Sequence, residues 1–158
     1  MKRVILFDWG NTLMVDFPQF SGKMYLWPEV AAVSQSHITL EKLMKDYDIY
    51  VATNAQDSTE SEIRSAFERA GLDKYINGYF CKSNLGLDKN CAAFYQTIIN
   101  SLGHHSSTVT MVGDSLDKDI YPAREAGLQT VYFNPHRHQV DENIVAIECL
   151  SQILEQKW

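Results

Sequence analysis

The sequence contains few of the residues that stabilise small secreted proteins or anchor a chain in a membrane. Among its 158 residues only three are cysteines, Cys81, Cys91 and Cys149, and they form no CxxC pair. This number and spacing argue against a secreted disulfide framework. The first apolar run, residues 4–7, ends at Asp8 and is too short for a signal peptide or a membrane span. We therefore expect a cytoplasmic protein with reduced thiols.

Positive charge is scarce as well. The chain has 14 Lys and Arg against 20 Asp and Glu, a formal net charge of −6 at pH 7. This balance does not favour nonspecific binding to nucleic acid or to an anionic membrane, so we expect neither as a partner. Any anionic ligand must be bound by local groups. No repeat or linker divides the chain, so we expect a single domain over residues 1–158.

Short apolar runs alternate with helical patterns along the chain. The runs are rich in β-branched and aromatic residues, which favours strands. They lie at residues 4–7, 49–53, 78–81, 108–112 and 129–133. The helical patterns lie at residues 38–45, 59–70, 90–102, 116–126 and 150–156. This alternation predicts a three-layer, Rossmann-like α/β fold with a mostly parallel five-stranded sheet.

Two of the expected helices carry informative boundary residues. Thr59 and Glu62 have the spacing of a capping box, and Gly71 suits the C-terminal cap of the same helix. Pro122 is expected to disturb the helix at 116–126 or to displace its start, because proline removes a helical hydrogen bond.

Residues 14–36 show no clear period. The segment is rich in aromatic residues and contains two prolines. One interpretation is an ordered surface segment that its own aromatic side chains pack together. The other is an irregular loop or flap that shapes a binding site.

Polar residues stand immediately after several of the predicted strands. In an open parallel sheet the carboxyl ends of the strands meet at one edge, where ligands bind. We therefore expect these residues to converge, together with a lysine that precedes the helix at 90–102. The residues are Asp8, Thr53, Asn54, Lys89, Asp114 and Asp119.

Three carboxylates at one edge need a compensating cation. Asp8, Asp114 and Asp119 would repel one another, and one lysine does not balance them. Carboxylate oxygens suit Mg²⁺, which is usually bound by one or two carboxylates together with substrate phosphates. Phosphoryl transfer follows as the expected chemistry, with Asp8 as a nucleophile that forms an aspartyl-phosphate.

The sequence resembles the haloacid dehalogenase (HAD) superfamily over nearly its whole length. Residues 7–12, FDWGNT, are similar to the first family motif, DxDxT after an apolar strand. Thr53 and Lys89 match the hydroxyl and lysine of the second and third motifs, although Asn90 replaces the usual proline. Residues 112–120, VGDSLDKDI, are very similar to the fourth motif.

The resemblance implies a role for each matching residue. Asp8 would be the nucleophile, and the metal ligands would be Asp8, Asp114 and the Gly10 carbonyl. Asp119 would be an outer ligand or would hold Lys89, which steadies the charges of Asp8 and of the phosphoryl group. The residues expected to bind substrate are Trp9, through its backbone amide, Gly10, Thr53, Asn54 and Lys89.

Gly10 departs from the family pattern. Phosphatases of the family usually carry a second aspartate at this position, and it protonates the leaving group and then deprotonates water. Such acid–base help contributes about 10²–10⁴-fold, so we expect acyl, aryl or anhydride phosphates to be favoured. Asp16 is one candidate for a displaced acid. Dehalogenases of the family also lack the second aspartate, but they do not need the acidic pair of the fourth motif. Because this chain has that pair, Asp114 and Asp119, dehalogenation is disfavoured.

The spacing of the motifs leaves no room for a full cap domain. The intervals between Thr12, Thr53 and Lys89 are too short for one, so the chain is expected to be a single catalytic domain with a flap at 14–36. The flap, a large substrate or a second copy of the chain would then cover the site. The histidines fit no zinc pattern and are expected at the surface; the four considered are His104, His105, His136 and His138.

The sequence as a whole predicts a Mg²⁺-dependent phosphohydrolase acting through Asp8. Its substrate would be a small phosphorylated compound or a phosphorylated macromolecule. The alternative is a regulatory or phosphate-binding protein of the same fold that turns over poorly because Gly10 provides no general acid.

Overall fold

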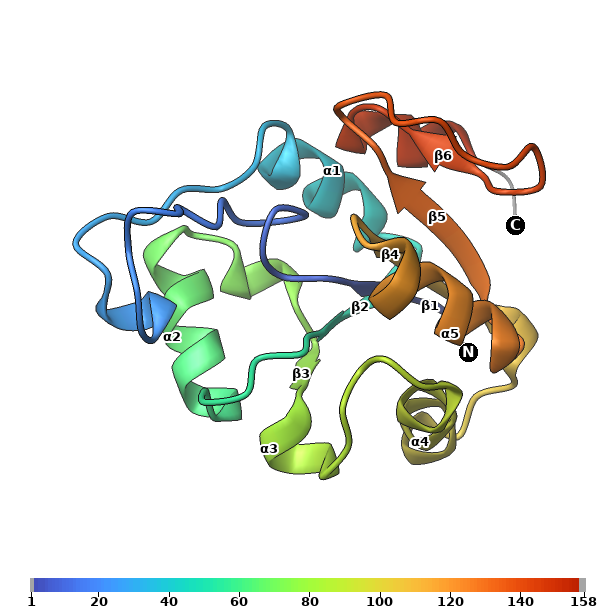
Figure 1. The fold of residues 1–158 in the computed structure, drawn as a ribbon, viewed down its shortest axis with the longest axis horizontal. Coiled ribbons are helices and arrows are strands. Elements are labelled where there is room, and N and C mark those ends of the chain that lie inside the picture. The colour runs from blue at the N-terminus through green and yellow to red at the C-terminus, as the bar shows by residue number, and fades with distance from the viewer. Residues whose placement is uncertain (1, 157–158) are drawn as a thin grey trace.

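A six-stranded sheet forms the middle layer of the protein (Figure 1). The computed structural model describes residues 2–156. The strands lie in the order β3-β2-β1-β4-β5-β6, and each neighbouring pair is parallel. Their bounds are β1 (Arg3–Phe7), β2 (Tyr47–Ala52), β3 (Gly78–Phe80), β4 (Val109–Gly113), β5 (Gln129–Phe133) and β6 (Ala146–Ile147).

The predicted three-layer α/β fold is confirmed, with one strand more than expected. All five predicted strands are present, shifted by no more than two residues at their ends. The sixth, β6, has two residues and pairs with the end of β5. A strand this short has no period that a sequence pattern could show.

Within residues 2–156, five α-helices and several shorter helical turns surround the sheet. The α-helices are α1 (Ser36–Leu43), α2 (Glu60–Arg69), α3 (Lys82–Leu85), α4 (Ala92–Leu102) and α5 (Tyr121–Glu125). A π-helix covers Leu116–Ile120, and 3₁₀ turns cover Met24–Leu26, Asp73–Tyr75, Ser106–Thr108 and Leu150–Glu155.

The helix boundaries follow the local signals in part. Thr59 and Glu62 form the predicted capping box at the start of α2. The segment at 116–126 is helical but not one continuous α-helix: a π-helix comes first, and α5 starts with Pro122 in its first turn, so the predicted disturbance by Pro122 is confirmed. Proline is tolerated there because the first turn of a helix needs no N–H donor. The helix expected at 150–156 is a 3₁₀ helix.

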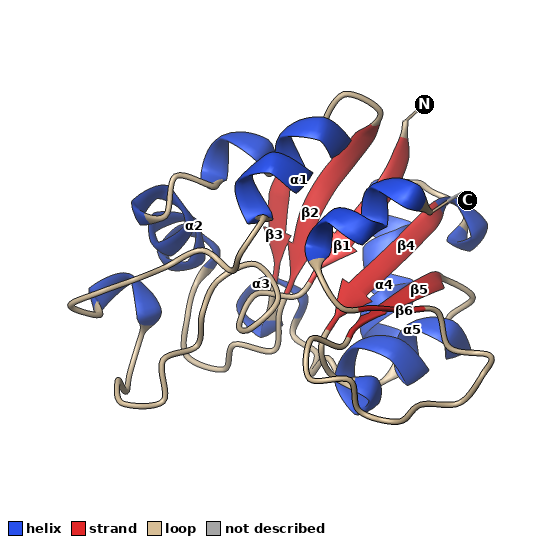
Figure 2. Cartoon of the chain, turned by 90° about the horizontal axis from the view of Figure 1, so that it is seen from above, coloured by secondary structure: helices blue, strands red, loops and turns tan. Residues whose placement is uncertain are grey.

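The two faces of the sheet are covered by different helices (Figure 2). Successive side chains of a strand point to opposite faces. In β1, Ile5 and Phe7 belong to one buried cluster with side chains of α1 and α2, whereas Val4 and Leu6 belong to a second with α4 and α5. Burial on both faces explains why β1 is apolar without interruption.

Residues 14–36, which we call the flap, are ordered and packed. The ring centroids of Phe17 and Phe20 lie 5.7 Å apart, and those of Phe20 and Trp27 lie 5.6 Å apart. Met24 and Trp27 are buried in the same cluster as Phe7. The aromatic side chains therefore hold the segment against the core, as the first interpretation of this segment requires.

Two cationic side chains, Arg69 of α2 and Lys23 of the flap, join the flap to α2. Arg69 Nη1 donates to the carbonyl oxygens of Tyr25, at 3.1 Å, and Trp27, at 2.6 Å. Lys23 Nζ lies 2.7 Å from Glu62 Oε2, and this hydrogen bond lowers the pKa of Glu62 to about 2. The turn at 24–26 is thus tied to a helix that belongs to the core.

No helix within residues 2–156 is both long enough and apolar enough to cross a lipid bilayer.

Arg69→Met is expected to loosen the flap. Loss of the two bonds to carbonyl oxygens should lower the free energy of unfolding by about 1 kcal/mol and speed tryptic cleavage after Lys23 several-fold. Urea denaturation and limited proteolysis measure the two effects. Arg64→Met is the matched control: the exposed Arg64 pairs with Glu60 of its own helix and lies over the Tyr79 ring, and both partners are outside the flap. Equal cleavage in both variants would contradict the anchoring role of Arg69.

Candidate active site

Asp8 and Asp114 lie side by side at the point in the sheet where the order of strand addition switches from one side of β1 to the other. From β1 the chain builds β2 and β3 on one side, then crosses to β4 and β5 on the other. Phe7 lies opposite Val112 in the β1–β4 pair, and the Asp8 N–H donates to the Val112 carbonyl at 2.9 Å. The residues after both strands therefore stand side by side at the switch point, where ligands bind in folds of this class.

A buried lysine joins two of the three carboxylates. The Lys89 side chain is 1% exposed, and its Nζ lies 2.7 Å from Asp8 Oδ1 and 2.6 Å from Asp119 Oδ1. The first contact is a well-directed hydrogen bond; the second is an ion pair without that geometry. The Lys89 N–H also donates to Asn54 Oδ1 at 3.0 Å, which fixes the backbone that carries the ammonium group.

The position of Asp119 depends on the π-helix and on Gly113. Asp119 Oδ2 accepts a hydrogen bond from the Ser115 N–H at 3.0 Å. A Cβ atom on Gly113 would collide with the Asp119 carboxyl group, so glycine is needed for this close approach. With one oxygen on Ser115 and the other on Lys89, Asp119 is placed to hold the lysine.

The carboxyl groups of the site have divergent pKa values. Burial is the largest single effect and would raise the pKa of Asp8, but the Lys89 ammonium and the hydrogen bonds of Asp8 with Asp114, Lys89 and the Trp9 backbone together outweigh it, so the pKa is lowered. Burial and the neighbouring Asp8 raise the pKa of Asp114 to about 8. Burial and repulsion by Asp8, partly offset by Lys89, raise the pKa of Asp119 to about 6. The site thus keeps Asp8 ionised while carrying more carboxylates than its one ammonium balances.

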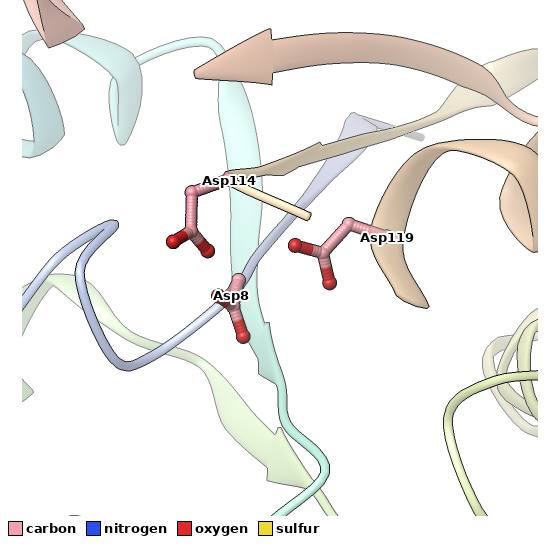
Figure 3. Close-up of side chains that lie close together, drawn as sticks. All are labelled: Asp8, Asp114 and Asp119. Atoms are coloured by element: carbon pink, nitrogen blue, oxygen red, sulfur yellow. The ribbon is translucent and has the colours of Figure 1, made fainter. Parts of the chain in front are cut away.

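The three carboxylates can reach a common cation. Each offers an oxygen, and these oxygens lie within 4.8 Å of one another (Figure 3). Because Asp119 already serves Lys89 and Ser115, Asp8 and Asp114 are the better ligands, and Gly10 borders the same cavity. Within residues 2–156 no other group of three His, Cys, Asp or Glu side chains converges in this way. The oxygen-only donor set fits Mg²⁺.

One cavity of about 260 Å³, which we call the Asp8 cavity, unites the predicted site residues except Trp9. Thr53 is buried and lines it; its Oγ1 accepts from the Ala55 N–H at 3.2 Å and so keeps its own proton for a ligand. The Trp9 side chain is directed elsewhere. Its indole is buried in the core, with Nε1 3.3 Å from Met14 Sδ. Trp9 lines a neighbouring cavity beside Trp27 instead.

Several residues of the site were not singled out from the sequence. The Thr12 hydroxyl lies 3.3 Å from Asp8 Oδ2 and 3.4 Å from Asp114 Oδ1, so it bridges the two carboxyl groups. Asn11, Ser115 and Lys118 also line the Asp8 cavity. Each lies within two residues of a predicted site residue, which is the signal that could have identified it.

Two further cavities adjoin the Asp8 cavity. One, of about 270 Å³, is lined by Trp27 and other flap residues, and we call it the Trp27 cavity. The other, of about 570 Å³, shares Asp114 and Asn11 with the Asp8 cavity and is bordered by His136 and His138. Both histidines are exposed, as predicted, but they stand at the site edge because they follow β5.

Gly113→Ala is expected to disturb the site from within β4. The added methyl group must displace the Asp119 carboxyl group, and such overpacking should lower the free energy of unfolding by about 1–3 kcal/mol. Gly10→Ala is the matched control: its Cβ would meet its nearest neighbour, Asp16 Cβ, at an ordinary 3.5 Å. Urea denaturation of both variants measures the effect, and equal stabilities would contradict it.

The structure and the sequence were compared with known proteins. A family model described as HAD-hydrolase-like matches residues 88–143. Pyrimidine 5'-nucleotidase PynA of Streptococcus pneumoniae is 34% identical over 116 residues, which are 72% of this chain and 48% of that protein. Ribulose-1,5-bisphosphate 5-phosphatase of Halopiger xanaduensis is 31% identical over 108 residues, 68% of this chain and 44% of that protein. The chain spans about half the length of these curated relatives.

The solved structures show the same fold. The crystal structure of the HAD-hydrolase YfnB of Bacillus subtilis, bound to magnesium, matches with a TM-score of 0.79 at 15% identity, over 98% of this chain and 97% of that one. The matched family model covers Lys89, Asp114 and Asp119. The chain belongs to the haloacid dehalogenase (HAD) superfamily of hydrolases.

Proposed function

We propose that the protein is a Mg²⁺-dependent phosphohydrolase that forms an aspartyl-phosphate on Asp8. The observation that carries this proposal is an ionised carboxylate, Asp8, which borders a polar cavity and lies against the buried ammonium of Lys89. An ionised carboxylate can attack phosphorus, whereas a protonated one cannot. Lys89 lowers the pKa of Asp8 and thereby keeps the nucleophile ready.

The proposed roles follow from the contacts of each side chain. Asp8, Asp114 and the Gly10 carbonyl would hold Mg²⁺, and Asp119 would hold Lys89. Bound Mg²⁺ supplies positive charge that neutralises the carboxylates and the phosphoryl oxygens. Thr53 and the amides that follow Asp8 would bind the phosphoryl oxygens on the opposite side.

The relatives support a small phosphorylated substrate. The two curated relatives are named as phosphatases of a pyrimidine nucleotide and of ribulose bisphosphate. Gly10 provides no carboxyl group that could protonate a leaving group. Acyl, aryl and anhydride phosphates are therefore the favoured substrates, because their leaving groups need little protonation.

The three cysteines are free thiols, which supports the proposed cytoplasmic location.

The same feature, Gly10, favours the second candidate function. A protein that binds phosphate and Mg²⁺ without efficient turnover would need Asp114 and Lys89 but no proton donor. The two candidates differ in whether any phosphate compound is hydrolysed through Asp8.

Hydrolysis of acetyl phosphate, p-nitrophenyl phosphate and a panel of sugar phosphates with Mg²⁺ separates these functions. We expect turnover by the wild type and a loss on the order of 10³-fold or more in Asp8→Asn, because the nucleophile is removed. Asp46→Asn, an exposed carboxylate that precedes the amino end of β2, opposite the end that Thr53 follows, is the control and should match the wild type. If no substrate is turned over above the Asp8→Asn level, the enzyme function is wrong and the binding function is supported.

Mg²⁺ binding should release a proton near neutral pH. With the pKa of Asp114 at about 8 in the metal-free protein, the group is mostly protonated at pH 7 and must ionise to bind a cation. The apparent affinity should therefore rise by up to about tenfold per pH unit from pH 6 to 8 and level off above pH 9. Titration calorimetry in two buffers of different ionisation enthalpy measures the protons released.

Asp114→Asn should abolish both the proton release and most of the Mg²⁺ affinity. The exposed Asp117 is the matched control: Asp117→Asn should keep both. A wild-type affinity that does not change between pH 6 and 9 would show that Asp114 is not a ligand.

A further inference from the structure

The space beside Gly10 is filled by another carboxyl group. A Cβ atom built on Gly10 would lie 3.5 Å from Asp16 Cβ, 3.7 Å from Asp16 Oδ2 and 3.8 Å from Asp16 Cγ. The carboxyl group that residue 10 lacks is thus provided next to it by a residue of the flap.

Hydrogen bonds in a tight reversal of the chain fix this position. The N–H groups of Leu13 and Met14 donate to the Trp9 carbonyl at 3.1 Å, and Asn11 adopts a φ of 59°. Asn11 Oδ1 then accepts from the Asp16 N–H at 2.9 Å. The backbone of Asp16 is therefore held by the segment that also carries Asp8.

Asp16 stands between two cavities. It lines the Asp8 cavity, where phosphate would bind, and it also lines the Trp27 cavity. Gly10 and Thr53 are the other residues common to both cavities. A group that leaves phosphorus and departs into the Trp27 cavity would pass this wall.

Asp16 is the remaining carboxyl group of the Asp8 cavity that has no other task. Asp8 is the nucleophile, Asp114 faces the cation position, and Asp119 is committed to Lys89 and Ser115. Asp16 shares none of these contacts within the described chain, residues 2–156.

We propose that Asp16 carries the proton of the reaction and that the leaving group occupies the Trp27 cavity, an inference that rests on the proposed function. As an Asp8 oxygen bonds to phosphorus, the bond from phosphorus to the leaving oxygen breaks, and that oxygen takes the proton of the Asp16 carboxyl group. Water then attacks phosphorus and gives a proton to Asp16, while the bond to Asp8 breaks and its electrons return to the Asp8 carboxylate. The products are an alcohol and inorganic phosphate, and Asp16 is protonated again.

The leaving group has a defined chemical class. The Trp27 cavity combines apolar walls from Met24 and Trp27 with polar groups at Asp57 and Ser58. It suits an alcohol with a flat or apolar part and at least one hydroxyl or amide. The substrate class therefore extends from good leaving groups to alkyl phosphates.

The test compares substrates that differ in their need for a proton. Asp16→Asn should lower kcat/KM for alkyl phosphates by ~10²–10⁴-fold and leave kcat/KM for acetyl phosphate nearly unchanged. The kcat should fall for every substrate, because the attack of water on the aspartyl-phosphate also uses Asp16. With substituted phenyl phosphates, its rate should depend more steeply on the pKa of the phenol than that of the wild type. Glu29→Gln removes a carboxylate from an exposed site on the same flap and should follow the wild type throughout.

A double variant tests whether the position of the carboxyl group, and not the residue that carries it, determines turnover. Gly10→Asp combined with Asp16→Ala returns a carboxyl group to the same space and should restore alkyl phosphate turnover relative to Asp16→Ala alone. If the double variant binds Mg²⁺ as the wild type does and turnover stays at the Asp16→Ala level, the positional argument is overturned.

The remaining outcomes separate this inference from the function on which it rests. An equal loss of kcat/KM on all substrates in Asp16→Asn, or no loss on any, would overturn the role of Asp16 while leaving the hydrolase in place. A wild type that cleaves acetyl phosphate but no alkyl phosphate would do the same. A wild type that cleaves nothing above the Asp8→Asn level overturns both.

Discussion

A buried ammonium group holds this site together. An ion taken out of water loses several kcal/mol of hydration, so Lys89 can be buried only because Asp8 and Asp119 both lie against it. The dependence is mutual, since the ammonium also offsets the repulsion between these two carboxylates. Lys89 precedes α4, Asp8 follows β1, and Asp119 lies in the π-helix after β4. Three distant segments therefore have to pack before any of the three charges is stable.

Lys89 does not balance all the negative charge of the three carboxyl groups, and the remaining negative charge favours the binding of a cation. Three carboxyl groups share one ammonium, and burial together with repulsion from Asp8 raises the pKa of Asp114 and of Asp119. A divalent cation neutralises the remaining negative charge and makes the cavity attractive to phosphate. The net charge of −6 is therefore compatible with an anionic substrate, because the local field at the sheet edge differs from the average over the surface.

Much of the fold can be predicted from the sequence because its signals are local. Strands buried on both faces need uninterrupted apolar runs, so β1 and β4 stand out, and a capping box joins residues three apart, so the start of α2 stands out. The convergence of Asp8 and Asp114 follows from the parallel order of the strands that precede them. These features need only the residue types, their spacing and the rule that strand ends share an edge.

Tertiary packing decided the features for which no local signal exists. Whether Asp119 binds a metal or a lysine depends on Gly113 and Ser115, which the π-helix brings close. The two-residue β6 exists only because β5 offers it an edge. The sequence determined that a carboxyl group is missing at Gly10, since that is a matter of residue type. Only the structure shows that Asp16 fills the vacant space, because its position depends on a backbone reversal and on hydrogen bonds that the order of residues does not reveal.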